Sequence, residues 1–347
     1  MKKVLAFFLA AVICFSIIGC QQTEDQREHD LEETQIQETK GDQIKPEKTE
    51  PEETEPEETQ PQRESTSTPL LYKVSDEDGD VVWLFGSIHV GVEEYYPLPD
   101  YVMDAFEGSD ALAVEFDLVS FEKNLGAQIK AVQSLMYTDG STIKDHIPEA
   151  LYNRAVEIAE QYDMYNKAYD YYIPMMWVSL IDNILVDCSE ADALLGVDRH
   201  MIEMAYEMDK PVLDVESAEF QYAMMAGFSD ELQIMLLEES VAGFDDVDEY
   251  ILELEEMIDI WMRGDEAAFA EMLSEEPLFD SAEEQVLYEE YNNAMVYERN
   301  LQMTEYAVDA LENGEEIFIC VGSAHVVGVG AMAQNLKELG YTVEVVQ

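Results

Sequence analysis

Basic residues are scarce in this chain of 347 residues, which has 18 Lys and Arg against 77 Asp and Glu and a formal net charge of −59. Proteins that bind nucleic acids neutralise phosphates with clustered Lys and Arg, and no such cluster follows Lys2 and Lys3. The composition therefore excludes nucleic acid as an expected partner. Hydrophobic residues make up 47% of the chain, which is enough for a core, so we expect most of it to fold.

Cysteine is equally rare. Cys14 and Cys20 lie in an N-terminal apolar segment, which leaves Cys188 and Cys320 for the rest of the chain. A disulfide framework is thus excluded. We expect two buried thiols, and the sequence leaves open whether they pair.

The N-terminal segment has the pattern of a signal peptide. It reads MKKVLAFFLAAVICFSIIGC, with two lysines, an apolar run and Gly19 before Cys20. Its ending resembles a bacterial lipobox, which implies removal of residues 1–19 and diacylglycerol on the sulfur of Cys20. A plain transmembrane anchor is the alternative, but the apolar run is short for a bilayer span. We therefore expect a lipoprotein anchored outside the cytoplasmic membrane.

The next segment, residues 20–68, lacks hydrophobic periodicity. It contains the near-repeat PEKTE-PEETE-PEETQ, and residues 21–68 hold 16 acidic and 5 basic side chains. Such a composition cannot bury enough apolar surface to fold. We expect a disordered, extended tether that holds a folded domain, residues 69–347, away from the membrane.

Two similar units lie at the ends of this domain. The first has an expected strand at 81–85, a helix at 99–107 and a strand at 111–116. The second has a strand at 317–321, a helix at 332–339 and a strand at 341–346. The segments VVWLFGSIHVG and IFICVGSAHVVG share a strand followed by Gly-Ser-x-His-Val. This similarity favours an internal duplication.

Helical periodicity dominates the middle of the chain. The expected helices lie at 151–161, 164–186, 198–208, 247–262, 266–273 and 283–312, with one further strand at 212–216. We predict a mixed α/β fold in which both terminal units build a central sheet and a large helical insertion separates them. The Met and Tyr side chains of 164–177 are expected to be core packing rather than a cofactor site.

Histidine is the third scarce residue, with five in the chain. His89 and His325 each end a Gly-x-x-His motif that directly follows an apolar strand, after Gly86 and Gly322. A glycine allows the backbone to turn sharply at the strand end. Side chains placed there reach the sheet edge at which open α/β folds bind ligands.

Glu115 ends another strand, where an ionised side chain is costly unless it is paired or bound to a metal. Two imidazoles and a carboxylate form a divalent metal site that leaves a position open for water. We expect His89, His325 and Glu115 to meet as exposed side chains at the sheet edge and to bind Zn, Mn or Co. The alternative is that Glu115 only forms a salt bridge and that both histidines are core residues.

These segments carry a resemblance to a known family. FGSIHVG, AVEFD, GVDRHMIEMAYEMDKPVLDVESAEFQ, ERN and CVGSAHVVGVGAMAQNLKELGYTVEVV are similar to the TraB/GumN family, which is related to the Tiki proteases and, more distantly, to the erythromycin esterase and ChaN proteins. The resemblance covers almost all of 70–347. It implies a metal-dependent hydrolase, proposed as a peptidase, with Gly86, His89, Glu115, Gly322 and His325 at its site. The further matching positions are Asp198, Glu216, Gln221, Arg299 and Asn300.

Several of these residues have alternative roles. Asp198 could reach the site or act as a helix N-cap, and His200 could also reach the site. Glu216 could orient a histidine. Arg299 is expected to pair with a buried carboxylate such as Glu216. Glu344 occupies in the second unit the place of the glutamate in the first, and we expect it to be a solvated strand residue.

Two functions fit these observations. One is a lipid-anchored extracytoplasmic metallohydrolase that acts on a peptide or a small molecule. The other is a non-catalytic surface lipoprotein that sequesters a peptide or another ligand on the same scaffold. The sequence leaves the substrate, the metal and the oligomeric state open.

Overall fold

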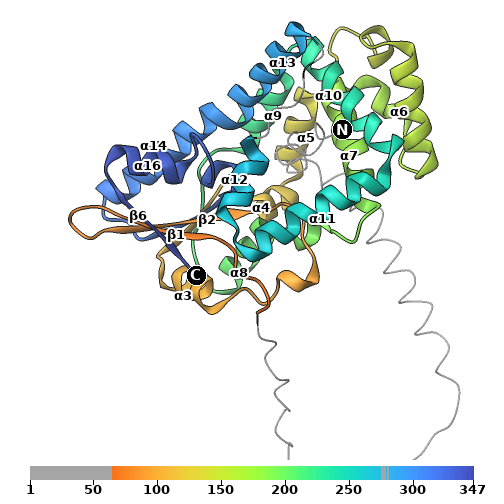
Figure 1. Cartoon of the computed structure of the whole chain (residues 1–347). Helices are drawn as coiled ribbons and strands as arrows, with labels where there is room; N and C mark the ends of the chain where they lie inside the picture. The colour runs from red at the N-terminus through yellow and green to blue at the C-terminus, as the bar shows by residue number, and fades with distance from the viewer. Residues whose placement is uncertain (1–64, 275–278, 280) are drawn as a thin grey trace, which may run out of the picture. The chain divides into compact units, whose positions relative to one another are not determined.

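A six-stranded mixed sheet lies at the centre of the fold (Figure 1). The computed structural model describes residues 65–274, 279 and 281–347. The strands are β1 (Leu71–Ser75), β2 (Val81–Ser87), β3 (Ala111–Val114), β4 (Val212–Asp214), β5 (Ile317–Gly322) and β6 (Thr342–Val346), in the order β4-β3-β5-β2-β1-β6. The predicted α/β fold, with a sheet built from both ends of the chain, is confirmed.

The four strands β4, β3, β5 and β2 run parallel, whereas β1 is antiparallel to its neighbours β2 and β6. All six residues of β5 are buried, because a central parallel strand is covered on both faces and needs a continuous apolar run. The carboxyl ends of four neighbouring strands therefore meet at one edge of the sheet.

Helices cover both faces of the sheet. Helices α3 (Asp100–Gly108) and α8 (Val197–Glu207) lie on one face, and α14 (Glu298–Glu312) and α16 (Met332–Leu339) lie on the other (Figure 1). The two predicted strand-helix-strand units thus pack on opposite faces. They also differ in where they end: β3 pairs with β5, whereas β6 lies at the far edge beside β1.

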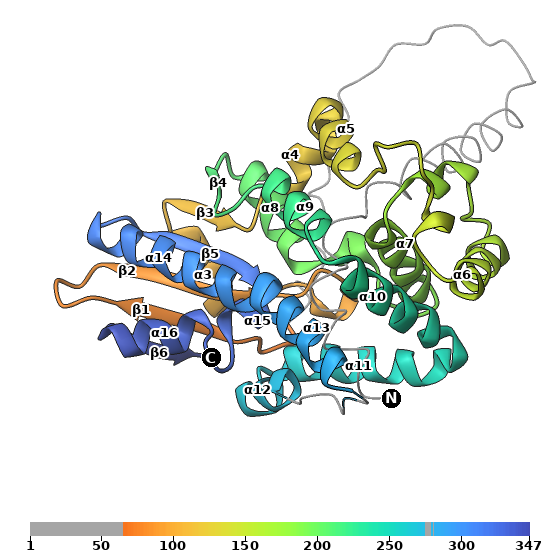
Figure 2. The same cartoon turned by 90° about the horizontal axis from the view of Figure 1, so that it is seen from above.

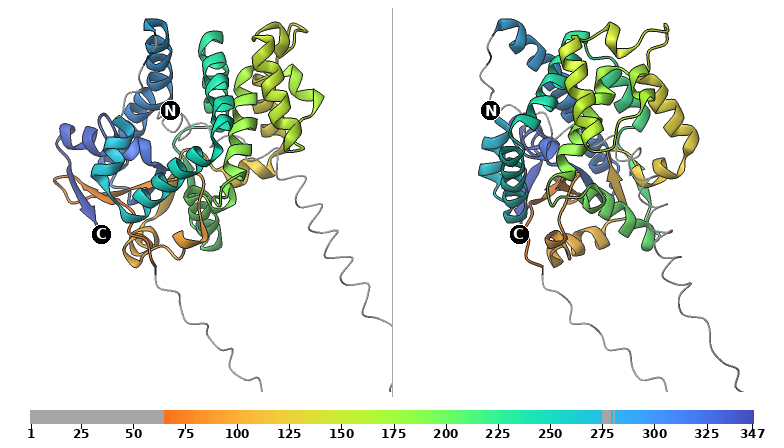
Figure 3. Two further views of the ribbon diagram at one scale, coloured as in Figure 1. Left: turned by 45° about the vertical axis from the view of Figure 1, so that its right-hand side comes forward. Right: turned by 90° about the vertical axis from the view of Figure 1, so that its right-hand side faces the viewer.

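A helical region lies beyond the carboxyl edge of the parallel strands (Figures 2 and 3). Its helices are α4 (Leu118–Lys123), α5 (Leu125–Ser134), α6 (Glu149–Gln161), α7 (Pro174–Asp187), α9 (Ala218–Ala226), α10 (Asp230–Ala242), α11 (Val247–Arg263), α12 (Glu266–Ser274) and α13 (Ala282–Asn292). They surround the edge at which ligands bind in open α/β sheets.

Two predicted helices are interrupted. Within 164–186, a short 3₁₀ turn at Lys167–Tyr171 precedes α7, which begins at Pro174 because proline is tolerated only in the first turn of a helix. Within 283–312, a π-helical turn at Asn293–Tyr297 joins α13 to α14. Of the Met and Tyr side chains of 164–177, Tyr169, Met175 and Met176 are buried as predicted, whereas Tyr171 is 48% exposed, so the predicted core packing holds for part of the segment.

The predicted signal peptide, Cys20 and most of the tether lie outside the described residues. The last tether residues, 66–68, already contact the domain. The hydroxyls of Thr66 and Ser67 donate to the carbonyls of Glu94 (3.2 Å) and Tyr95 (3.4 Å), and the amide of Thr68 donates to the carbonyl of Met262 (2.6 Å). These contacts begin three residues before the expected domain start at 69. Over the described ranges, the helices are too short or too polar to cross a membrane.

Both cysteines of the domain are free thiols. Cys320 is buried in β5, as expected. Cys188 is partly exposed at the end of α7, where its sulfur lies 3.4 Å from the Tyr162 hydroxyl. The expectation of two buried thiols is therefore wrong for Cys188, because it caps a helix end at the surface instead of pointing into the core.

Candidate functional site

The first Gly-x-x-His motif lies at the end of β2. The indole N–H of Trp261 on α11 donates to the carbonyl of Gly86 (2.8 Å), so α11 is held against this strand end. A Cβ at Gly86 would stand 2.7 Å from the Ser323 hydroxyl oxygen. The glycine is therefore needed for the two Gly-x-x-His segments to approach each other.

The second motif follows β5 and forms a short helix, α15 (Ser323–Val326), which carries His325. The corresponding residues after β2 are not helical, so the same motif has two backbone conformations. A Cβ at Gly322 would stand 3.1 Å from Oε1 of Glu115 and 3.2 Å from Nε2 of His89. The missing side chain thus leaves room at the point where the predicted ligands face one another.

The structure brings the three predicted ligands together. Nε2 of His89 lies 4.0 Å from Oε1 of Glu115, and Nε2 of His325 lies 3.9 Å from the same oxygen. Their side chains are 8%, 7% and 4% exposed for His89, Glu115 and His325. The expectation of exposed side chains at the sheet edge is therefore wrong, because the helical region covers that edge.

Glu115 is held by three donors. Its Oε1 accepts the amide N–H of Gly322 (2.9 Å), and its Oε2 accepts from Nη2 of Arg299 (2.5 Å) and Nε2 of Gln221 (2.9 Å). Burial alone would raise the pKa of Glu115, but the guanidinium of Arg299, the two histidines and the Gly322 amide together outweigh burial and hold this pKa well below its usual range. The carboxylate therefore stays ionised.

Arg299 joins Glu115 to a second buried carboxylate, Glu216. Its Nε donates to Oε1 of Glu216 (2.9 Å) and its Nη2 to Oε2 of Glu216 (2.8 Å). The amide of Glu216 donates to the carbonyl of Glu115 (2.8 Å), so the two glutamates follow paired strand ends. The predicted pairing of Arg299 with Glu216 is present. Glu216 orients this arginine and Gln221 rather than a histidine.

Asp198 lies beside His89. The amide of Val197 donates to the carbonyl of Ile88 (2.8 Å), which fixes the start of α8 next to this histidine. Oδ2 of Asp198 is 3.1 Å from Nδ1 of His89, although the two groups are not aligned for a hydrogen bond. Burial alone would lower the pKa of His89, but the Asp198 carboxylate raises it above its usual value. Asp198 is not the N-cap, which is Gly196.

His325 has a different partner. Its Nδ1 lies 2.7 Å from Oδ1 of Asn300, which follows Arg299 on α14. Burial, together with the positive charge of Arg299, lowers the pKa of His325 to about 3. The two histidines are thus unequal: His89 faces a carboxylate and His325 faces a neutral amide.

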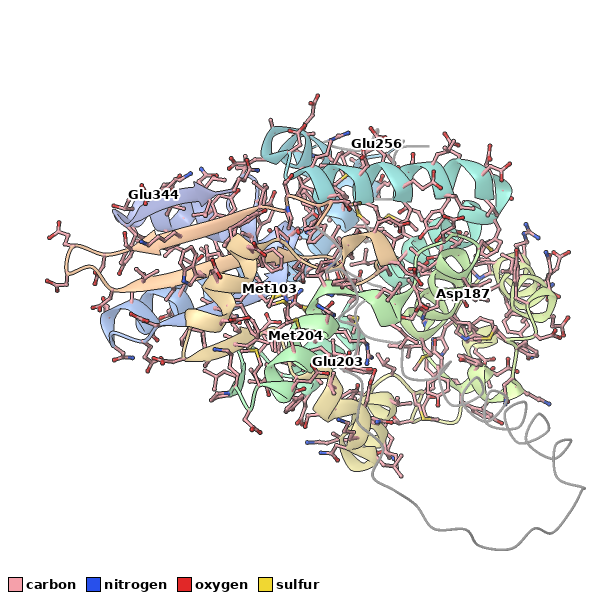
Figure 4. The ribbon with its side chains drawn as sticks, turned by 90° about the horizontal axis from the view of Figure 1, so that it is seen from below. Met103, Asp187, Glu203, Met204, Glu256 and Glu344 are labelled. Atoms are coloured by element: carbon pink, nitrogen blue, oxygen red, sulfur yellow. The ribbon has the colours of Figure 1, made fainter. Side chains whose placement is uncertain are left out.

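Two candidates from the sequence lie elsewhere. The ring of His200 packs on Tyr96, with 4.0 Å between ring centroids, and burial lowers its pKa to about 4. Glu344 is exposed on the edge strand β6, opposite Lys73 in the strand register (Figure 4). It is a solvated strand residue, as expected.

Reasoning from residue patterns alone did not find Gln221, Asn300 or Trp261. Gln221 and Asn300 entered only through the family resemblance, and Trp261 was not predicted at all. The available signal for Gln221 is a buried amide within the apolar helix AEFQYAMMA, since a buried polar side chain requires a hydrogen-bond partner.

The donor set agrees in chemistry with a divalent cation. In the described part of the chain, no group of three or more His, Cys, Asp and Glu is already arranged as a metal site. Ligand atoms at about 2.1 Å from a tetrahedral ion lie about 3.4 Å apart. The distances of 4.0 and 3.9 Å from Oε1 of Glu115 to the two histidine Nε2 atoms are therefore about half an ångström too long for a bound ion. Neither ring nitrogen of the buried His89 has a hydrogen bond to a described residue.

The charges at the site also favour a cation. Glu115 and Glu216 share one buried guanidinium, that of Arg299, and the carboxylate of Asp198 lies beside His89. Histidines that bind a metal are neutral, and with both histidines neutral these three carboxylates and one guanidinium carry two more negative charges than positive ones. A divalent ion would balance this excess, which is costly in a buried site.

Comparison with known proteins finds one family model and curated relatives. The model of the TraB/PrgY/gumN family matches residues 70–345. Two curated relatives, each described as "Uncharacterized protein YbaP", come from Escherichia coli K12 and Shigella flexneri. Each is 23% identical over 259 residues, a match that covers 73% of this chain and 87% of the relative. No solved structure matches the chain.

Proposed function

This chain belongs to the TraB/PrgY/gumN family, and we propose that it is a metal-dependent hydrolase that cleaves peptide bonds outside the cytoplasmic membrane. The observation that carries the proposal is the meeting of His89, His325 and Glu115 around the space left by Gly322. Two imidazoles and a carboxylate with room for water are the ligand set of many hydrolytic metal sites.

In this proposal Nε2 of His89, Nε2 of His325 and Oε1 of Glu115 hold a divalent ion such as Zn, Mn or Co. When bound, such an ion lowers the pKa of a water molecule and polarises a substrate carbonyl. Arg299 keeps Glu115 ionised, which suits a permanent anionic ligand and not a proton donor.

The charge of the domain bears on the substrate. Residues 69–347 contain 61 acidic and 11 basic side chains, and a strongly negative surface attracts cations and repels anions. This potential disfavours phosphate esters and favours neutral or cationic peptides. A peptide substrate therefore agrees with both the site and the field around it.

The proposed location rests on Cys20. The small residue before it and the tether after it support lipidation and attachment to the outer face of the cytoplasmic membrane. Cys20→Ser should release the protein into the soluble fraction. Retention of this variant on washed membranes would place the anchor elsewhere.

The function is tested on the purified full chain by metal analysis and by turnover of a peptide library, with and without chelator. His89→Ala, His325→Ala and Glu115→Gln should each lower metal affinity by about 10-fold to 100-fold or more and abolish turnover. The matched controls are His200→Ala and Glu344→Gln, which change the same residue types away from the ligands and should retain both properties.

Folding of each variant is checked by circular dichroism, so that loss of activity is not confused with unfolding. A protein that binds no divalent metal, or cleaves equally well in chelator, would contradict the proposal. Tight peptide binding without any cleavage, unchanged in the three ligand variants, would support the sequestering function in its place.

A further inference from the structure

Asn300 connects His325 to the loop that follows it. The side chain is completely buried on α14. Its Oδ1 lies 2.7 Å from Nδ1 of His325, and its Nδ2 donates to the carbonyl of Gly330 (3.0 Å). One amide group therefore contacts both the histidine and the backbone that comes five residues later.

The chemistry of these contacts fixes their direction. A backbone carbonyl can only accept, so the NH₂ group of Asn300 must face Gly330 and its oxygen must face His325. That oxygen can also only accept. Nδ1 of His325 must therefore carry the proton, and in the neutral ring Nε2 is left with a lone pair.

The Gly330 carbonyl is held independently of Asn300. It also accepts from Nδ2 of Asn335 on α16 (3.0 Å), and the Gly330 amide donates to Oε1 of Gln334 (3.0 Å). Gly330 has φ +73°, a conformation that favours glycine. The acceptor that orients Asn300 is thus part of a fixed loop.

The tautomer decides what the site can bind. Nε2 of His325 lies 3.9 Å from Oε1 of Glu115. With the proton on Nε2, the ring would become a donor to this carboxylate and would offer no lone pair to a cation. With the proton on Nδ1, the ring is a ligand.

We infer that Asn300 is a positioning residue that sets the tautomer of His325, so that its Nε2 lone pair faces Glu115 and His89. The tautomer follows from the hydrogen bonds alone, whereas its use in metal binding rests on the proposed function. His89 has no comparable partner among the described residues, because the Asp198 carboxylate is not aligned with its ring for a hydrogen bond.

The test compares Asn300→Leu, which removes the acceptor at similar volume, with Asn300→Asp, which keeps an acceptor. Asn335→Ala is the control, because it removes a donor to the same carbonyl without touching His325. The tautomer of His325 is measured by long-range ¹H–¹⁵N NMR on the metal-free full chain, with His325→Ala to assign the signal. Zinc affinity is measured in parallel.

We expect the Nδ1–H tautomer in the wild type, in Asn300→Asp and in Asn335→Ala. In Asn300→Leu the proton should move to Nε2, and zinc affinity should fall about 10-fold to 100-fold. Retention of the Nδ1–H tautomer in Asn300→Leu, or the Nε2–H tautomer in the wild type, would overturn the inference. If the tautomer changes as expected but the wild type binds neither zinc nor manganese nor cobalt, the proposed function fails and the positioning role remains.

Discussion

Replacing Arg299 with methionine is the most direct test of how the site is held together. The Arg299 side chain is 1% exposed and forms ion pairs with Glu115 and Glu216, whose side chains are 7% and 2% exposed. Methionine keeps much of the apolar volume and removes the charge. Because both carboxylates stay buried without their main cation, we expect the free energy of unfolding to fall by about 3–5 kcal/mol. That is a large part of the free energy of unfolding of a typical folded protein, which is about 5–15 kcal/mol.

The assay is urea unfolding at two pH values, with Arg154→Met as the control. Arg154 also pairs with two carboxylates, Glu157 and Asp245, but it is 37% exposed, so its loss should cost less than about 1 kcal/mol. Arg299 lowers the pKa of Glu115. Without it the folded-state pKa rises, so the cost of Arg299→Met should be largest at neutral pH and shrink as acid protonates the carboxylates.

If Arg299→Met loses no more free energy of unfolding than Arg154→Met, this reasoning is refuted. If Arg299→Met does not fold, the triple variant with Glu115→Gln and Glu216→Gln decides the matter. Neutral amides need no counter-charge, so this variant should recover most of the lost stability. A triple variant as unstable as the single one would mean that Arg299 acts through packing instead of charge.

Two further predictions concern stability away from the site. Burial raises the pKa of Asp182 on α7 to about 8, against about 3.9 in an unfolded chain. Between these two pH values the folded state holds a proton that the unfolded state has lost, so the free energy of unfolding falls as the pH rises. The free energy of unfolding of Asp182→Asn, measured by urea titration, should therefore rise relative to that of the wild type by up to about 4 kcal/mol between pH 5 and pH 8. The same difference between variant and wild type at both pH values would contradict this. A chain that begins at Ser65 should have the same free energy of unfolding as the full chain. A chain that begins at Leu70 loses the hydrogen bonds of Ser67 and Thr68, so its free energy of unfolding should be about 2 kcal/mol lower. Equal melting temperatures for the two truncated chains would show that residues 65–69 add no stability.

The strands that carry the site were predictable because each is a short apolar run that ends in glycine or glutamate. Val81–Phe85 and Ile317–Val321 fall within β2 and β5 as expected. The strand β1 was not predicted, because LYKVS mixes polar and apolar residues and is not a continuous apolar run. Its pairing with both β2 and β6 is a tertiary contact that local sequence does not encode.

The internal similarity predicted the elements of both units but not their partners. The first unit returns to the sheet at β3, beside β5, and so brings Glu115 to the site. The second returns at β6, beside β1, because β2 and β1 already occupy the sheet on that side of β5. Similar segments therefore place Glu115 at the centre and Glu344 at the edge, since the position of a strand in a sheet depends on which strands are already there.

The residues around the three proposed ligands come from helices, and this explains why the sequence pointed to the proposed ligands first. His89, Glu115 and His325 follow strand ends, where Gly-x-x-His and an acidic residue stand out against an apolar run. Asp198, Gln221 and Asn300 each lie on a helix, with a polar side chain turned inward. Such residues become recognisable only when the fold shows what they face. Because each one lies beside a proposed ligand without being one, substitutions on α8, α9 and α14 should alter the site while leaving both Gly-x-x-His motifs unchanged.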